Sequence, residues 1–146
     1  MSEKLTRSEW TRTPYAKTTA ANTHGDVKRL LAKYEITDWQ WTSGQMNGRQ
    51  AVQLRFAYQG APYTITARVL DADASDEELL RQVERAVFHY LKSLVEISGP
   101  FFPLSQVLAT HLQLEDGQTV GQLVEANRDA LPAIRQKLLI GPGGES

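Results

Sequence analysis

The strongest constraint on the fold is a strict alternation of apolar and polar side chains between residues 52 and 69. Every second residue is apolar there, first Val52, Leu54, Phe56 and Tyr58, then Tyr63, Ile65, Ala67 and Val69. A period of two is typical of a strand that buries one face. The pattern therefore predicts two neighbouring strands of a half-buried sheet.

Two turn signals place these strands in a larger unit. Residues 59–62 form a short connection that contains glycine, which is typical of a hairpin. Asn47 and Gly48 favour a tight turn because both tolerate positive φ. A further strand is therefore predicted at 37–42, with 43–48 as its connection. Together, residues 37–69 predict a three-stranded antiparallel meander.

The predicted sheet has one apolar face and one polar face, and the polar side chains are Gln53, Arg55, Thr64, Thr66 and Arg68. Trp39 and Trp41 share one face of the first strand, and the sequence leaves two alternatives. Facing inward, they belong to the core, as large aromatic side chains usually do. Facing outward, they lie beside Arg55 and Arg68 and form a platform for stacking.

Helices are predicted on both sides of the meander. The first begins near Thr23, which forms a capping box with Asp26, and its apolar stripe is Val27, Leu30, Leu31 and Tyr34. The second spans 75–98. Ser75 and Glu78 form its capping box, and Gly99 with Pro100 ends it. Its stripe is Leu79, Leu80, Val83, Val87, Tyr90, Leu91, Leu94 and Val95.

The C-terminal part predicts shorter elements. A short apolar helix begins near Pro103, a short strand covers 112–114, and a capping box of Thr119 and Gln122 starts another helix at Val120. Pro132 then breaks that helix or opens a new one. The fold class is α+β: a helix, a three-stranded antiparallel meander, a long helix that covers one sheet face, and a C-terminal helical appendix.

The length of 146 residues indicates a single domain. We expect a flexible N-terminal arm over 1–20, a domain over 21–140 and a flexible tail over 141–146. The arm interleaves cations with aromatics in Arg7, Trp10, Arg12, Tyr15 and Lys17. It is interpreted either as a free polar tail or as a segment that lies along a phosphate backbone.

Charge is distributed unevenly along the chain. Residues 1–70 hold ten Lys or Arg and five Asp or Glu, whereas residues 71–146 hold six and twelve. The net charges of the two parts are +5 and −6. They indicate either two faces that are solvated differently, or a basic surface with a binding role. Such a surface would bind nucleic acid, or it would bind the acidic surface of a second copy of the chain. The chain has no cysteine and no apolar run long enough to span a bilayer. We therefore expect no membrane association and a cytoplasmic location.

No motif predicts catalysis. His24, His89 and His111 lack metal-ligand spacing, and the chain has no nucleophile elbow and no phosphate-binding loop. Asp76, Glu77 and Glu78 complement the dipole of the predicted helix over 75–98, which accounts for most of this acidic cluster without a metal. Asp71 and Asp73 form only a lone D-x-D, which is a weak signal for Mg²⁺. The sequence thus predicts a protein that is not an enzyme, with no catalytic residue, no metal and no cofactor.

Five stretches carry a resemblance to a known family: YAKTT, VKRLLAKYEITDWQW, RQAVQLRFAYQGAPYTITARV, LLRQVERAVFHYLKSLVEISGPFF and LATHLQLEDGQTVGQLV. Over about residues 15–124 the chain resembles a family of small uncharacterised proteins encoded in phages, prophages and metagenomic contigs. Glu35 stands where that family usually has Gly, Gln122 stands where it has Glu, and its Arg-Trp pair is missing from the long helix. The resemblance implies a mobile-element origin, hence the cytoplasm of a host cell, and implies no activity.

The order of elements is also similar to that of the double-stranded-RNA-binding domain. That domain contacts phosphates through lysines at the start of its last helix. The matching residues here, 74–78, are acidic and would repel phosphate. The order of elements is therefore shared without that binding mode.

These observations lead to two hypotheses. The first is a non-catalytic accessory protein that binds nucleic acid, single strands included, through a basic sheet face and the N-terminal arm. Its predicted contacts are Arg49, Arg55, Arg68, Lys28, Arg29, Trp39, Trp41, Arg12 and Lys17. The alternative is a protein-interaction or self-assembly module, for example one that inhibits a host factor. It is motivated by the near-neutral charge and by Phe101, Phe102 and Leu104.

Overall fold

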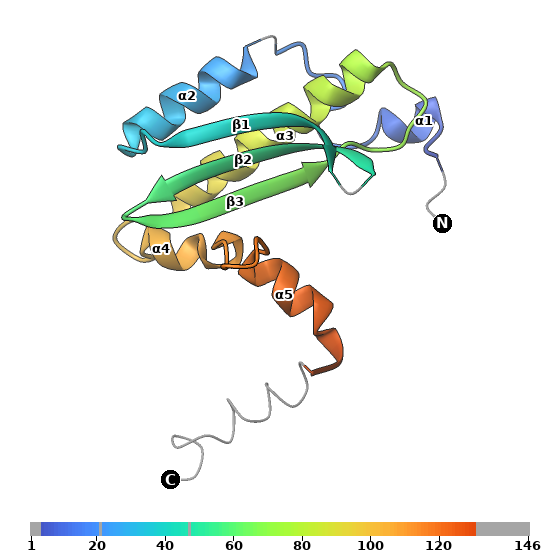
Figure 1. Cartoon of the computed structure of the whole chain (residues 1–146). Helices are drawn as coiled ribbons and strands as arrows, with labels where there is room; N and C mark the ends of the chain where they lie inside the picture. The colour runs from blue at the N-terminus through green and yellow to red at the C-terminus, as the bar shows by residue number, and fades with distance from the viewer. Residues whose placement is uncertain (1–3, 21, 47, 131–146) are drawn as a thin grey trace.

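The computed structural model describes residues 4–20, 22–46 and 48–130. Its central unit is a three-stranded sheet flanked by helices, as predicted (Figure 1). In chain order the elements are α1 (Arg7–Trp10), α2 (Thr23–Lys33), β1 (Trp39–Met46), β2 (Arg49–Tyr58), β3 (Ala61–Arg68), α3 (Asp76–Ile97), α4 (Leu104–Val107), the 3-10 turn η1 (Ala109–His111), α5 (Val120–Ala126) and the 3-10 turn η2 (Arg128–Ala130).

The sheet is an antiparallel meander in the order β1-β2-β3. Its register places Trp41 opposite Leu54, and Leu54 opposite Ile65. The hairpin between β2 and β3 is tighter than predicted, because β3 already begins at Ala61. Only Gln59 and Gly60 connect the strands, and both have the positive φ that a two-residue hairpin requires.

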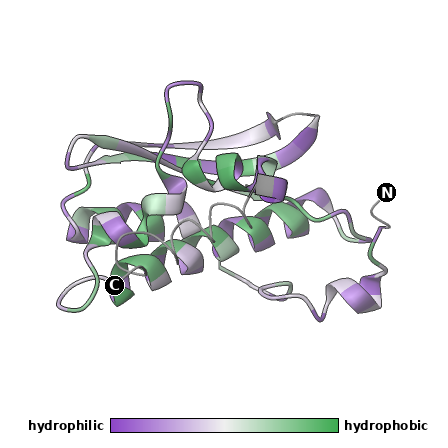
Figure 2. Cartoon of the chain, turned by 90° about the horizontal axis from the view of Figure 1, so that it is seen from below, coloured by the Kyte–Doolittle hydropathy of each residue, from purple (hydrophilic) through white to green (hydrophobic). Residues whose placement is uncertain are grey.

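The main core lies between one face of this sheet and the helices α2, α3 and α4. The alternating residues Val52, Leu54 and Phe56 are buried there, as are Val27 and Leu31 of α2. α3 passes behind the sheet in Figure 1, and the strands and α3 form separate layers in Figure 2. The predicted α+β architecture, with the long helix covering one sheet face, is therefore confirmed.

α3 follows its sequence signals closely. Ser75 caps it through the predicted capping box with Glu78, and it ends before Gly99. Leu79, Val83, Val87, Leu91 and Val95 of the predicted stripe are buried. Tyr90, which was predicted within the stripe, is exposed instead, and its hydroxyl lies 2.6 Å from Nε2 of His111.

Several boundaries differ from the predictions. β1 extends to Met46, because its pairing with β2 continues through residues expected in the connection. α2 is capped by Asn22, whose side chain accepts from the Gly25 N–H, so the capping box predicted at Thr23 is wrong.

The C-terminal part also differs from its prediction. The expected strand over 112–114 consists only of isolated bridges, in which Leu112 pairs with Tyr63 and Gln113 with Thr119. Phe101 and Phe102 precede α4 and are exposed, whereas Leu104 and Leu108 are buried in the core. The capping box of Thr119 and Gln122 is present at the start of α5. The predictions for Leu131 onward, including the break at Pro132 and the tail over 141–146, lie outside the described residues.

The N-terminal segment packs against the start of α3. Trp10 at the end of α1 is only 1% exposed, and its indole N–H donates to Oε1 of Gln82 over 2.7 Å. The Gln82 amide in turn donates to Oγ1 of Thr13 and to the Pro14 carbonyl. Residues 4–20 therefore pack against the fold, in contrast to the interpretation as a free polar tail, while the domain bounds at 20, 21, 140 and 141 stay a prediction.

Replacing Trp10 tests this packing. Because Trp10→Ala removes a buried aromatic side chain, we expect it to lower the free energy of unfolding by about 3–5 kcal/mol. Urea denaturation measures this loss. The control is Arg12→Ala in the same segment, at an exposed position where the change should stay within about 0.5 kcal/mol. Equal stability of the two variants would contradict the packing of this segment.

A second test uses pH. A bidentate hydrogen bond from the Arg7 guanidinium, helped by the Ser75 N–H, lowers the pKa of Glu78 from 4.5 to about 2. A lowered folded-state pKa stabilises the fold above the unfolded value, and this contribution is lost as pH falls from 4.5 toward 2. We expect Arg7→Ala to raise the Glu78 pKa toward 4.5 in an NMR titration. An unchanged pKa would show that Arg7 does not hold this carboxylate.

Candidate functional site

The face of the sheet that points away from α2 and α3 is the candidate site, and we call it the open face. It consists of the alternate strand residues on the side away from the main core: Gln40, Thr42, Gly44, Arg49, Ala51, Gln53, Arg55, Ala57, Pro62, Thr64, Thr66 and Arg68, of which Ala51 and Thr64 are buried. None of the residues in β1, β2 and β3 is acidic. The open face therefore combines arginines with uncharged polar side chains.

The arginines lie toward two ends of this face. Arg68 is opposite Ala51, so Arg49 is its diagonal neighbour on the next strand, at about 7–8 Å between Cα atoms. Arg55 lies six residues along β2 from Arg49, or roughly 20 Å. All three are exposed, and none forms an ion pair with another described residue.

Acidic groups border the Arg55 end of the open face. Asp38 precedes β1 and lines a shallow hollow of about 180 Å³ with Gln40, Arg55 and Gln113. Gln113 accepts a hydrogen bond from the Thr64 hydroxyl, and the turn that follows carries exposed Glu115 and Asp116. Exposed Asp71 and Asp73 follow β3 a few residues beyond Arg68, so acidic residues flank both ends of the open face.

The tryptophans do not belong to the open face. Trp39 is opposite Phe56 and Trp41 opposite Leu54, so both rings lie on the covered face and pack against the core. The His24 ring of α2 contacts both, with centroids 5.4 and 5.9 Å away. The alternative in which they form a stacking platform beside Arg55 and Arg68 is therefore wrong, because the strand register fixes their side.

The remaining predicted contacts lie in the helical layer. Lys28 and Arg29 are exposed on α2, and Arg29 is paired with Asp26. Asp26 also bonds to Arg85 of α3 over 2.7 Å, and these arginines lower its pKa. Arg12 and Lys17 are exposed in the segment that packs along α3. Of the nine predicted residues, only Arg49, Arg55 and Arg68 therefore lie on the open face, and of these only Arg49 and Arg68 are neighbours.

A polar hollow of about 540 Å³ lies between the start of α2 and α3, and no sequence pattern predicted it. His24, Glu77, Arg81 and Glu84 line it. Burial raises the pKa of Glu84, while the neighbouring Trp41 indole and His24 oppose that rise. Glu77 and Arg81 are paired across 2.6 Å. This hollow brings one histidine and two carboxylates together, although Arg81 neutralises one of them.

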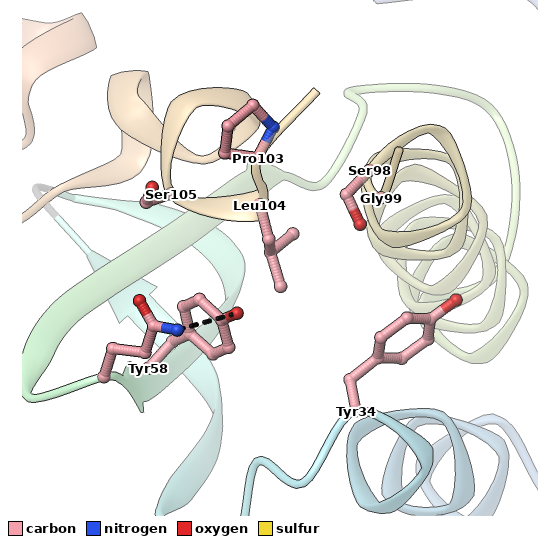
Figure 3. A pocket seen from close by; sticks show the side chains of 8 residues that line it. Tyr34, Tyr58, Ser98, Gly99, Pro103, Leu104 and Ser105 are labelled. Atoms are coloured by element: carbon pink, nitrogen blue, oxygen red, sulfur yellow. Dashed lines mark hydrogen bonds between the residues drawn. The ribbon is translucent and has the colours of Figure 1, made fainter. Parts of the chain in front are cut away.

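An uncharged hollow of about 380 Å³ lies where α2, the β2–β3 hairpin and the α3–α4 loop meet (Figure 3). Tyr34 and Tyr58 line opposite sides, and Leu104 points between them. Ser98 donates to the Val95 carbonyl and Tyr58 accepts from the Gln59 amide. The lining of this hollow contains hydroxyl and amide groups and no charged side chain.

Among residues 4–20, 22–46 and 48–130, no three His, Asp or Glu side chains lie close enough to hold a metal ion together. In the same part of the chain, no helix has the length and apolar character needed to cross a membrane. Comparison of the chain with protein-family models, with curated proteins and with solved structures gave no match.

The placement of the tryptophans can be checked by substitution. Trp41→Ala removes a partly buried ring from the core, and we expect a loss of about 2–3 kcal/mol in the free energy of unfolding, below the range for a fully buried tryptophan. The adjacent Gln40→Ala on the open face is the matched control and should change stability by less than about 0.5 kcal/mol. Urea denaturation measures both, and an unchanged stability for Trp41→Ala would place its ring outside the core.

Proposed function

We propose that the chain is a non-catalytic accessory protein of a phage or other mobile element that binds nucleic acid through the open face. The observation that carries the proposal is the charge pattern of that face, where Arg49, Arg55 and Arg68 are exposed on strands without any acidic residue. Arginine side chains bind phosphate oxygens through several donors at once. A face of this kind suits a polyanion better than an uncharged partner.

Backbone contacts, and not base stacking, would supply the affinity. Proteins that bind single strands without sequence preference stack the bases on aromatic side chains. The open face has no aromatic residue, because Trp39 and Trp41 point into the core. The proposed mode is therefore phosphate binding, and its affinity should depend strongly on salt. Because the bases are not stacked, this mode should not prefer single strands.

Acidic residues flank this face at both ends. Asp38, Glu115 and Asp116 lie around the Arg55 end, and Asp71 and Asp73 follow Arg68 along the chain. Phosphates would therefore bind at the arginines of the strands and be repelled from the turns beyond them.

A second candidate function is protein interaction, supported by the apolar side chains around the end of α3. Phe101 is 85% exposed, and Ile97 and Phe102 are about half exposed. Exposed aromatic side chains in a cluster are typical of contacts between proteins. This candidate uses a different surface from the open face, so the two can be separated by substitution.

The test of the first proposal is fluorescence anisotropy with labelled single-stranded and duplex oligonucleotides over a range of salt. With three phosphate contacts, log K should fall with log salt at a slope of roughly −2 to −3. The variant Arg49→Ala with Arg68→Ala should weaken binding to every sequence and reduce the size of that slope by roughly 1.4–1.8.

The matched control is Lys17→Ala with Lys28→Ala, which removes the same charge from exposed positions in the helical layer. It should leave the slope unchanged. Equal effects of the two double variants would show that net charge, and not the open face, determines binding. Absence of binding at low salt would overturn the proposal and favour the surface around Phe101.

A further inference from the structure

The two outer edges of the sheet differ in a way that the proposed function does not explain. A strand at the edge of a sheet presents unpaired N–H and C=O groups to which another strand can bond. Proteins usually protect such edges with proline, charged residues, bulges or covering segments. The β3 edge has two of these protections. Pro62 has no N–H to offer, and its carbonyl accepts from the Gln113 N–H over 2.9 Å.

The β1 edge has none of these protections. β1 is eight residues long, and its sequence WQWTSGQM contains no charged residue and no proline. Its pairing with β2 is continuous from Trp39 to Met46, without a bulge. Such a strand is suited to receive another strand along its full length.

The hydrogen-bond phase identifies which groups are free at this edge. The Ala57 N–H donates to the Asp38 carbonyl. Every second residue after Asp38, that is, each even-numbered residue of β1, therefore forms its backbone hydrogen bonds with β2. The residues between them direct their N–H and C=O outward, and these are Trp39, Trp41, Ser43 and Gln45. No described residue bonds to these outward groups.

The geometry points to a second copy of this chain as the occupant of the β1 edge, in an antiparallel pair related by a two-fold axis. A two-fold axis perpendicular to the sheet must pass through a residue that faces its own copy. With Thr42 at that position, Trp39 pairs with Gln45 of the second copy and Trp41 with Ser43. This register uses all outward N–H and C=O groups of both strands.

The absence of charge from β1 favours a copy of itself over a foreign strand. In a two-fold pair every charged residue near the axis would lie close to its own like charge, which destabilises a sheet. β1 contains none, and Asp38 at its start would lie opposite Met46 and far from the other Asp38. The pair forms one six-stranded sheet whose two open faces are continuous, which doubles the arginines on one surface.

Cysteine cross-linking tests this register, because the chain has no cysteine of its own. In a non-hydrogen-bonded antiparallel pair the facing Cα atoms lie about 4.5 Å apart, within the range that a disulfide bridges. We expect Thr42→Cys to give a disulfide-linked dimer under mild oxidation. The control is Thr66→Cys, in the same row of the open face but on β3, which should stay monomeric on a non-reducing gel.

A charge substitution supplies the second measurement. Sedimentation of the full chain over a concentration series should show a monomer–dimer equilibrium. Thr42→Lys places two like charges at the axis and should abolish the dimer, whereas Thr66→Lys adds the same charge to the same face and should retain it. A monomer at every concentration, or a dimer that persists in Thr42→Lys while Thr42→Cys gives no cross-link, would overturn the proposal. Neither measurement depends on nucleic-acid binding, so the outcome is separate from that of the proposed function.

Discussion

The packing of α3 against the covered face of the sheet is the contact on which the rest of the structure depends. Its stripe supplies Val83, Val87, Leu91 and Val95 to the main core, and its first turn supplies Leu79 to the smaller core around Trp10. α2, the sheet, α4 and the N-terminal segment therefore all meet the same helix. The long stripe matters because a three-stranded sheet of this size cannot cover its own apolar face.

The sequence was most informative where periodicity and burial agree. The alternation around Leu54 and Ile65, and the stripe of α3 with its cap at Ser75, predicted these elements because one buried face determines the side-chain pattern. Predictions from composition were less informative. Residues 4–20 were interpreted as a polar arm because their large buried side chain, Trp10, has no apolar neighbours at regular spacing.

A local signal for this segment was present in the sequence. Thr6 and Glu9 form a capping box, which predicts a helix start directly before Trp10. The contact with Gln82, in contrast, joins residues 72 positions apart, and no local pattern encodes it. The candidate site shows the same difference between local and long-range information. Alternation within the strands identified Arg55 and Arg68 as residues of the polar face. The side on which Trp39 and Trp41 lie depends on the register of β1 with β2, which no local pattern encodes.

The two halves of the chain do not separate into a basic and an acidic body. Arg7 of the basic half bonds to Glu78 of the acidic half, whereas Asp26 and Arg85 pair the minority charge of each half, so ion pairs join the two halves within the fold. The arginines of the open face stay outside this network because the strands around them lack carboxylates. The charges are thus segregated by secondary structure. The only charged residues in the three strands are arginines, whereas the acidic residues lie in helices, turns and loops.

The contact between Trp10 and Gln82 also determines when the first residues of the chain can fold. During synthesis at roughly 5–20 residues per second, Trp10 precedes its partner by about 4–14 s. The covered face of the meander also waits, because α3 is the main helix packed against it. Synthesis of α3 therefore completes the packing of both the sheet and the N-terminal segment, and Trp10 lacks its buried hydrogen-bond partner throughout this interval.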